Sequence, residues 1–308
     1  MPISEAWVIL ELPVLEKRIY KSSPDSLLFH YCSAETLMAI CSSKSIRMSD
    51  INMMNDYNES QYGYGVFEEA ANQILGDAKV ASVFPDFNED FFDQVDQQIS
   101  PLQIHIHPVI ASLSKNPDVL SQWYRYADGG RGFSLGLDVS LLEKMPVTIL
   151  EVEYDRSVQI KETREALTGI FMRNKTEKLG YGSEFRQECI LLGAMLLSFK
   201  SSAFAEEQEV RLLHLLDVAD HNESPRLMDA GGVCNGRNVR GQPVKYRVSD
   251  GAFVAYIDSP FPLSKKHSII REVWWGPKNE NGIGNVVYMM SEYGWKASTT
   301  HKSEATFR

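Results

Sequence analysis

The chain has 308 residues and carries 31 Lys and Arg against 41 Asp and Glu, a formal charge of −10 at pH 7. Its length fits one large domain or two small ones. The acidic balance argues against broad, charge-driven binding to nucleic acid. The longest nearly apolar run, Ile190–Phe199, is about half of the ~20 residues that a membrane span needs, so no transmembrane segment is expected.

The four cysteines suggest a reducing compartment. They are Cys32, Cys41, Cys189 and Cys234, which form no CxxC pair and are too few for a disulfide framework. No cluster of ligands has the spacing of a zinc site, and we expect no metal. The N-terminus has acids and no basic segment before its apolar stretch, unlike a signal peptide. We therefore expect a cytoplasmic protein.

Strands and helices alternate along the first half of the chain. Leu27–Tyr31 reads as a short buried strand, and Ser33 is a candidate N-cap for a helix over Ala34–Ser42, followed by a strand at Ser45–Met48. A mostly helical stretch at about 60–100 comes next. Further strands are expected at Gln103–Ser114 and Phe133–Asp138.

The second half continues this pattern. Thr148–Tyr154 alternates like a strand, and about 160–200 is mostly helical, while Gln208–Leu216, Ala252–Ile257 and Glu272–Trp275 read as strands. Ala230–Gly241 is rich in glycine and is expected to be a mobile loop. The pattern predicts an α+β fold with a mixed, mostly antiparallel central sheet. We expect a single domain over 1–308, with helical insertions at about 60–100 and 160–200.

Two candidate binding regions combine aromatic residues with a polar group. His30 and Tyr31 end the first strand, where a His can bond a sugar hydroxyl or simply a backbone carbonyl of the core. The segment Gln122–Asp138 places Trp123, Tyr124 and Tyr126 before a glycine-rich turn that carries Arg131. These side chains suit a planar ring attached to a phosphate, although core packing explains the aromatics equally.

A third candidate region carries paired carboxylates. With a strand beginning near Gln208, the residues Glu207, Glu209 and Arg211 share one face, and Val210 and Leu212 share the other. The apolar face belongs in the core, so the charged face lines either solvent or a cleft. In a cleft, a carboxylate stabilises a developing oxocarbenium ion or acts as a general base.

Five segments, in this order, resemble a bacterial family known only as domain of unknown function 2971. They span residues 28 to 277 and read LFHYCSAETLMAICSSKSIRMSD, NDYNE, LSQWYRYADGGRGFSLGLD, FKSSAFAEEQEVRLL and VWWGP. The family name implies no activity.

A more distant resemblance connects the chain to ADP-ribosyltransferases. A strand-end His before a helix, here His30, is similar to the opening of poly-ADP-ribose polymerases and DarT-like DNA ADP-ribosyltransferases, where it binds NAD ribose. Glu207-Gln208-Glu209 resembles the E-x-E of arginine-directed ADP-ribosyltransferases. The resemblance implies an ADP-ribosyltransferase-like fold, NAD as co-substrate, His30 on the adenine-side ribose, and Glu209 as the catalytic carboxylate with Glu207 assisting the acceptor. It also implies a Tyr stacked on nicotinamide, either Tyr124 or Tyr126.

We therefore expect an NAD-consuming ADP-ribosyltransferase or NAD glycohydrolase. By family association it would act as a toxin or antiphage defence effector, with a partner protein in that system and a protein or nucleic acid as acceptor. One alternative is a non-catalytic module that binds a nucleotide or a protein. The other is a metal-dependent nuclease, whose carboxylates would be Asp56, Glu59, Glu207 and Glu209.

Overall fold

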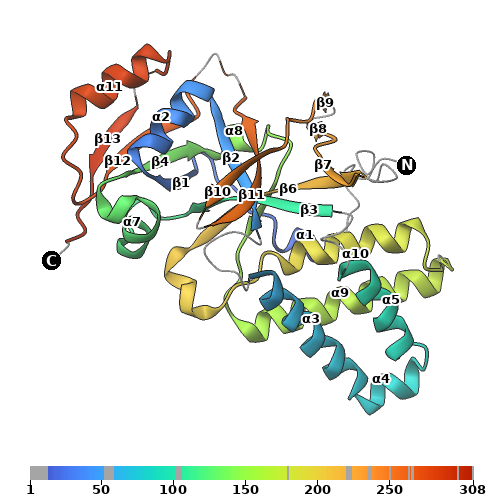
Figure 1. The fold of residues 1–308 in the computed structure, drawn as a ribbon. Coiled ribbons are helices and arrows are strands. Elements are labelled where there is room, and N and C mark those ends of the chain that lie inside the picture. The colour runs from blue at the N-terminus through green and yellow to red at the C-terminus, as the bar shows by residue number, and fades with distance from the viewer. Residues whose placement is uncertain are drawn as a thin grey trace.

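The computed structural model describes residues 13–51, 59–100, 106–178, 180–219, 224–234, 237–249, 251–262, 264, 267–296 and 298–306. The described chain is an α+β protein: strands occupy one part, and a group of helices extends from it (Figure 1). Asp56 lies outside the described residues, and of Glu59 only the backbone is described. None of the described helices is both long enough and apolar enough to span a bilayer.

Within the described residues, eleven strands form one mixed sheet whose pairings are antiparallel except for β12 with β13. Its main path runs β10-β11-β2-β3-β1-β4-β12-β13, and β6, flanked by β5 and β7, joins at β3. The strands are β1 (Leu27–Cys32), β2 (Ser45–Asp50), β3 (Ile106–Ser114), β4 (Phe133–Asp138), β5 (Thr148–Glu151), β6 (Glu209–Ala219), β7 (Arg226–Met228), β10 (Lys245–Ser249), β11 (Ala252–Pro260), β12 (Ile270–Trp275) and β13 (Thr299–Lys302).

The sheet forks at β3. One edge of β3 pairs with β6 from Ile106 to Ser114. The other edge pairs first with β2, at Val109 and Ile110, and then with β1, at Ser114 alone. Between these two contacts β1 and β2 diverge, and no described strand pairs with that stretch of the β3 edge.

The helices fall into two groups. Those beside the sheet are α1 (Pro13–Glu16), α2 (Ala34–Ser43), α7 (Leu120–Tyr126), α8 (Val139–Leu142), α11 (Ile283–Glu292) and the 3₁₀ helices η3 (Asp128–Gly130) and η4 (Ser202–Glu207). The extending group comprises α3 (Glu59–Leu75), α4 (Ala78–Val83), α5 (Glu89–Ile99), α9 (Arg156–Glu177) and α10 (Ser183–Leu196). These lie in the two ranges that the sequence marked as helical insertions.

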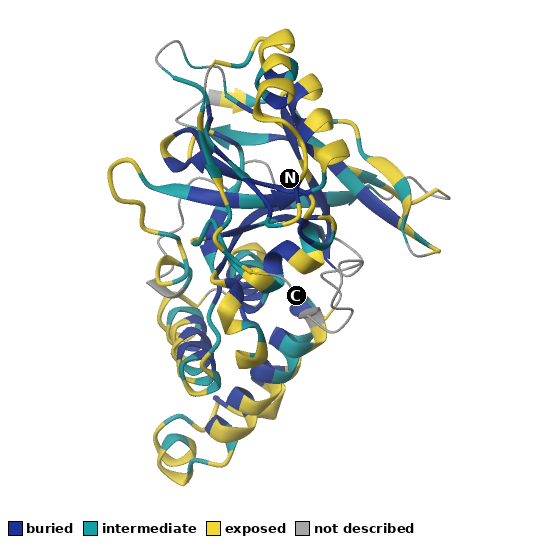
Figure 2. Cartoon of the chain, turned by 90° about the vertical axis from the view of Figure 1, so that its left-hand side faces the viewer, coloured by how far each residue is buried: buried dark blue, intermediate teal, exposed yellow. Residues whose placement is uncertain are grey.

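Each group of helices encloses its own hydrophobic core. The larger core lies between one face of the sheet and α2, α8 and α11. The second lies among α3, α5, α9 and α10, and includes Phe87 stacked on Phe171 with ring centroids 4.3 Å apart. Figure 2 shows these helices buried on the side that faces their neighbours and exposed on the other, as amphipathic helices require.

The β1–α2–β2 unit agrees with the local sequence signals. Ser33 caps α2, and its hydroxyl accepts a hydrogen bond from the Thr36 N–H. Leu37, Ile40 and Cys41 are buried at helical spacing. Lys44 ends the helix in the left-handed conformation, with φ 54°, and β2 follows directly.

Two expectations need correction. Part of Ala230–Gly241, expected as a mobile loop, forms the antiparallel pair β8 (Gly232–Cys234) and β9 (Arg237–Val239). The strand expected from Gln208 begins at Glu209, because Gln208 is in the left-handed conformation after η4. Glu207 therefore ends a 3₁₀ helix instead of sharing a strand face with Glu209.

Candidate functional site

A cavity of about 690 Å³ lies at the fork of the sheet. Its lining comes from β1, α2, β2, β3, α7, the end of η4, the start of β6, and the hairpin β10–β11. This volume is within the range of small-molecule and cofactor sites. His30, Tyr31, Tyr126, Glu207 and Glu209, all expected from the sequence to bind or act on a ligand, line this one cavity.

His30 reaches across the fork to the open edge of β3. Its Nδ1 lies 3.3 Å from the carbonyl oxygen of Ser112. Burial lowers the pKa of His30, although the Ser112 carbonyl opposes that shift. In the neutral ring, Nδ1–H donates to the carbonyl and Nε2 is left as an acceptor. A ligand hydroxyl is a suitable donor to it.

Glu209 is a buried carboxylate whose hydrogen-bonding capacity is full. Arg211 donates to both of its oxygens, at 2.8 and 3.0 Å. Ser112 Oγ donates to Oε1 at 2.7 Å, and Lys200 Nζ to Oε2 at 3.1 Å. Burial alone would raise the pKa of Glu209, but Arg211 and Lys200 hold it well below its ordinary value. A carboxylate offers about four acceptor positions, and all are taken.

Among the described residues, Glu207 accepts fewer hydrogen bonds than Glu209 does. Lys200 Nζ donates to its Oε2 at 2.6 Å, and Arg125 approaches Oε1 at 3.3 Å. Burial raises the pKa of Glu207, and Lys200 offsets only part of that shift. A buried carboxyl with a raised pKa and open acceptor positions is suited to take up or release a proton.

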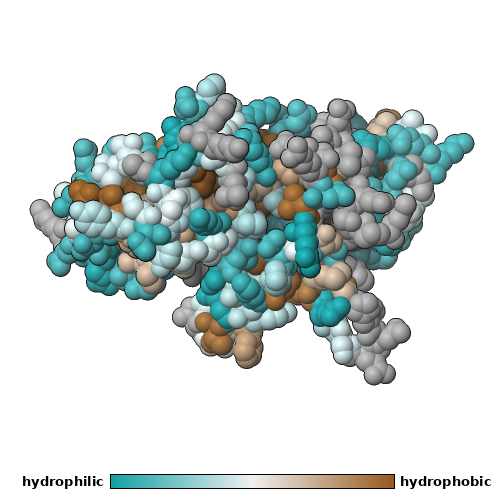
Figure 3. Space-filling view, turned by 90° about the horizontal axis from the view of Figure 1, so that it is seen from above, coloured by the Kyte–Doolittle hydropathy of each residue, from teal (hydrophilic) through white to brown (hydrophobic). Residues whose placement is uncertain are grey.

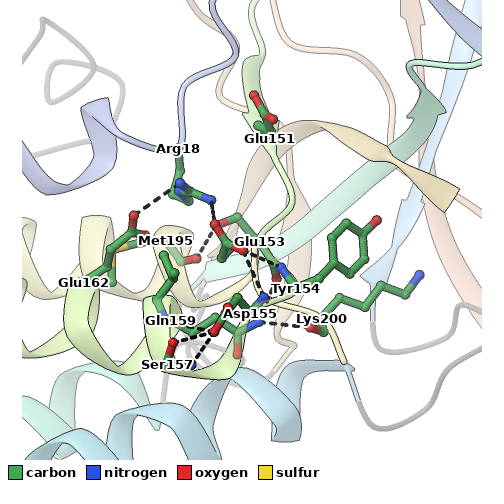
Figure 4. A network of polar contacts seen from close by, with 12 residues as sticks. Arg18, Glu151, Glu153, Tyr154, Asp155, Ser157, Gln159, Glu162, Met195 and Lys200 are labelled. Carbon is green, nitrogen blue, oxygen red and sulfur yellow. Dashed lines mark hydrogen bonds and ion pairs between the residues drawn. The ribbon is translucent and has the colours of Figure 1, made fainter. Parts of the chain in front are cut away.

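A polar network around Gln159 fixes the backbone at Lys200 (Figure 4), and Tyr154 extends it to Glu209. Gln159 donates to the backbone carbonyls of Glu153 and Lys200, at 2.6 and 2.9 Å. The Tyr154 hydroxyl accepts a hydrogen bond from the Glu209 N–H at 2.9 Å. Arg18, in turn, forms ion pairs with Glu153 and with Glu162 of α9, at 3.0 and 3.2 Å. The acidic end of the cavity is thus anchored to the helical part of the chain.

The expected aromatic residues separate into two sets. Tyr126 lines the cavity, and burial, with the nearby Glu207 as the next cause, raises its pKa to about 12. Tyr31 also lines it, but its hydroxyl donates to the Asn116 carbonyl and accepts from the Val119 N–H. Trp123 is fully buried against Tyr31, with ring centroids 4.8 Å apart. It does not line the cavity.

Two further residues of this segment also lie outside the cavity lining. Tyr124 is 69% exposed. Arg131 is exposed and forms a two-bond ion pair with Asp128, at 2.9 and 3.0 Å. The structure therefore brings only part of the Gln122–Asp138 segment to the cavity, through Gln122 and Tyr126.

The residues that line the cavity from β2 and the hairpin β10–β11 were not predicted from the sequence. These include Arg47 of β2, Arg247 and Ser249 of β10, and Asp258 of β11. Only Asp250-Gly251, a dipeptide typical of two-residue hairpin turns, signalled in the sequence that a strand precedes Ala252. Lys200, which donates to both Glu207 and Glu209, was not among the candidate site residues predicted from the sequence.

In the described part of the chain, no group of three or more His, Cys, Asp or Glu side chains is arranged to hold a metal ion. Glu207 and Glu209 instead form ion pairs with three cationic side chains. These are Lys200, Arg211 and Arg125.

The comparison with known families bears on this cavity. Residues 122–212 match the family described as Protein of unknown function (DUF2971). The matched segment includes Tyr126, Lys200, Glu207, Glu209 and Arg211. It is narrower than the span of residues 28 to 277 over which the sequence resembles this family. No curated protein and no solved structure matches the chain.

Proposed function

We propose that this protein cleaves the bond between nicotinamide and ribose in NAD, as an ADP-ribosyltransferase or an NAD glycohydrolase. The supporting observation is that His30, Tyr126 and Glu207 line one cavity of about 690 Å³. The proposal includes an ADP-ribosyltransferase-like arrangement of the sheet. The fork between β1 and β2, with the cavity inside it, supports that part.

The reaction needs few protein groups. The bond from ribose C1′ to the nicotinamide nitrogen breaks, and its electron pair neutralises the pyridinium ring. C1′ becomes oxocarbenium-like, as in other glycosyl transfers, and a hydroxyl of water or of an acceptor adds to it. The acceptor's proton passes to the carboxylate of Glu207, whose raised pKa suits this role.

The contacts around the cavity give the other residues distinct roles. Tyr126 is the aromatic residue offered to the nicotinamide, since Tyr124 lies outside the cavity lining. His30 Nε2 accepts a ribose hydroxyl. Glu209 acts as a positioning residue, because Arg211, Lys200 and Ser112 already fill its acceptor positions. It fixes Lys200 beside Glu207.

The test is release of nicotinamide from NAD by purified protein in the presence of EDTA. We expect Glu207→Gln to lower the rate on the order of 10²–10³-fold, as loss of one preorganised electrostatic group does. The matched control is Glu206→Gln, because Glu206 is the preceding residue and is exposed. It should keep the wild-type rate.

Three outcomes would contradict the proposal. One is equal rates for the two variants. Another is activity that disappears with EDTA, which would favour the metal-dependent alternative. The third is no release together with no rise in Tm at millimolar NAD, which would remove NAD as ligand. A rise in Tm without turnover would favour the binding module instead. The acceptor, protein or nucleic acid, and a role as toxin or defence effector belong to the same proposal.

A further inference from the structure

The hairpin β10–β11 presents two different faces. Side chains alternate along a strand, and Arg247 and Ser249 point to the face that lines the cavity. Tyr246, Val248 and Phe253 belong to the opposite face and are 59%, 66% and 75% exposed. β2 pairs with β11 and adds Arg47 to the cavity face.

Arg247 is a cation without a partner. Within the described part of the chain, its guanidinium has no ion pair and no hydrogen bond, and it lines the cavity. Arg47 is only partly engaged. Its Nε donates to Asp258 at 3.0 Å, and its guanidinium lies 3.9 Å from the ring centroid of Tyr256. Among the described residues, its two terminal nitrogens have no hydrogen-bond partner.

This wall of the cavity has surplus positive charge. Asp258 is the carboxylate between the strands, and it also accepts a hydrogen bond from Lys245 at 3.0 Å. Arg47 and Lys245 therefore share one carboxylate, and Arg247 adds a third positive charge beside them. The other acid of the lining on this side, Glu35, is exposed in the first turn of α2. A guanidinium presents a planar fork of donors that matches phosphate oxygens.

We propose that Arg47 and Arg247 bind the phosphates of a nucleoside diphosphate group. Only the identification of this group as the diphosphate of NAD rests on the proposed function. The two arginines then orient the ligand by attracting its phosphates at the hairpin end, because the cations at the β6 end already form ion pairs with Glu207 and Glu209. This orientation leaves the ribose that carries the nicotinamide beside Glu207.

The test measures affinity with three probes: ADP, inorganic diphosphate and adenosine. For the wild-type protein we expect ADP to bind and to raise Tm, and adenosine to bind at least tenfold more weakly. Arg247→Gln and Arg47→Gln should each weaken ADP binding about tenfold or more, because hydrogen bonds between charged groups are removed. The matched control is Arg226→Gln, since Arg226 is an exposed strand arginine outside the cavity. It should bind ADP like the wild type.

Each result decides for or against the subsite. Equal binding of ADP and adenosine, unchanged ADP binding by Arg247→Gln, or no binding of ADP and diphosphate would overturn it. Inorganic diphosphate that binds as tightly as ADP would overturn the assignment to a nucleoside diphosphate. Arginine-dependent ADP binding without release of nicotinamide would keep the subsite and remove the NAD reaction. Release of nicotinamide with an unchanged KM in Arg247→Gln would do the reverse.

Discussion

Glu207 and Glu209 are two positions apart, and their surroundings give them different chemistry. Glu209 accepts four hydrogen bonds, three of them from the cations Arg211 and Lys200. Glu207 shares Lys200 but has a raised pKa. The spacing E-x-E in the sequence indicated a pair of carboxylates. It did not indicate which of them is held by buried cations, because those contacts depend on the tertiary structure.

Glu209 should be important for stability. Glu209→Gln leaves Arg211, which is 1% exposed, without its charged partner. Removing one member of a buried ion pair costs ~3–5 kcal/mol of unfolding free energy. Urea denaturation measures this loss, with Glu206→Gln as the control of equal chemistry on an exposed residue. A loss below about 1 kcal/mol, as for a surface ion pair, would contradict the buried arrangement.

Tyr154 makes a contact that can be tested separately. Its hydroxyl accepts the Glu209 N–H, so Tyr154→Phe leaves that N–H without its acceptor. We expect a cost of about 1–3 kcal/mol in unfolding free energy. Tyr288→Phe is the control, because Tyr288 is 73% exposed on α11. Equal stability of the two variants would show that the Tyr154 hydroxyl does not hold β6.

At the scale of elements, α9 and α10 carry a buried acid away from the cavity. Glu188 of α10 is 2% exposed, and Arg173 of α9 lies 3.0 Å from its Oε1. Burial raises the pKa of Glu188 to about 7 from an ordinary value of 4.5, and Arg173 only partly offsets this. The folded protein therefore keeps a proton, between pH 4.5 and 7, that the unfolded chain has lost.

The consequence is a dependence of stability on pH. The contribution of Glu188 to the unfolding free energy should fall by on the order of 2–3 kcal/mol as the pH rises from about 4.5 to 7, and level off above. Glu188→Gln should flatten this part of the profile, as measured by denaturation at each pH. Glu206→Gln, an exposed acid on η4 that is not among the charges acting on Glu188, should leave the profile as in the wild type. A Glu188→Gln profile that matches the wild type would contradict the raised pKa.

Several elements could be predicted because their signals are local. The strand Phe133–Asp138 was predicted with its bounds. The capped helix after Ser33 follows from a cap and helical spacing within ten residues. The strand Lys245–Ser249 was missed although its residues alternate, because it is short and its apolar positions, Tyr246 and Val248, are exposed instead of buried in the core. Burial was therefore a poor guide to that strand.

At the scale of the whole molecule, the candidate site depends on pairings that sequence periodicity does not contain. Which edge of β3 receives β1 and which part receives β2 decides where the sheet forks. Alternation along a strand indicates which side chains share a face of the sheet. It does not indicate which other strand pairs with that strand. Hydropathy of the surface adds no further clue: in Figure 3, hydrophobic residues form small separate patches among hydrophilic ones on the face shown.

The fork also has a consequence for how the protein matures during synthesis. Ser45 of β2 pairs with Pro260 of β11, so one side of the cavity joins segments that are far apart in the sequence. Contacts at such separation form slowly, and a nascent chain emerges at about 5–20 residues per second. A nascent chain that has been synthesised only as far as residue 251 contains His30 and Glu207. It lacks β11, so the hairpin β10–β11 has not formed. Ligand binding at this cavity should therefore begin only after β11 has been synthesised as far as Pro260.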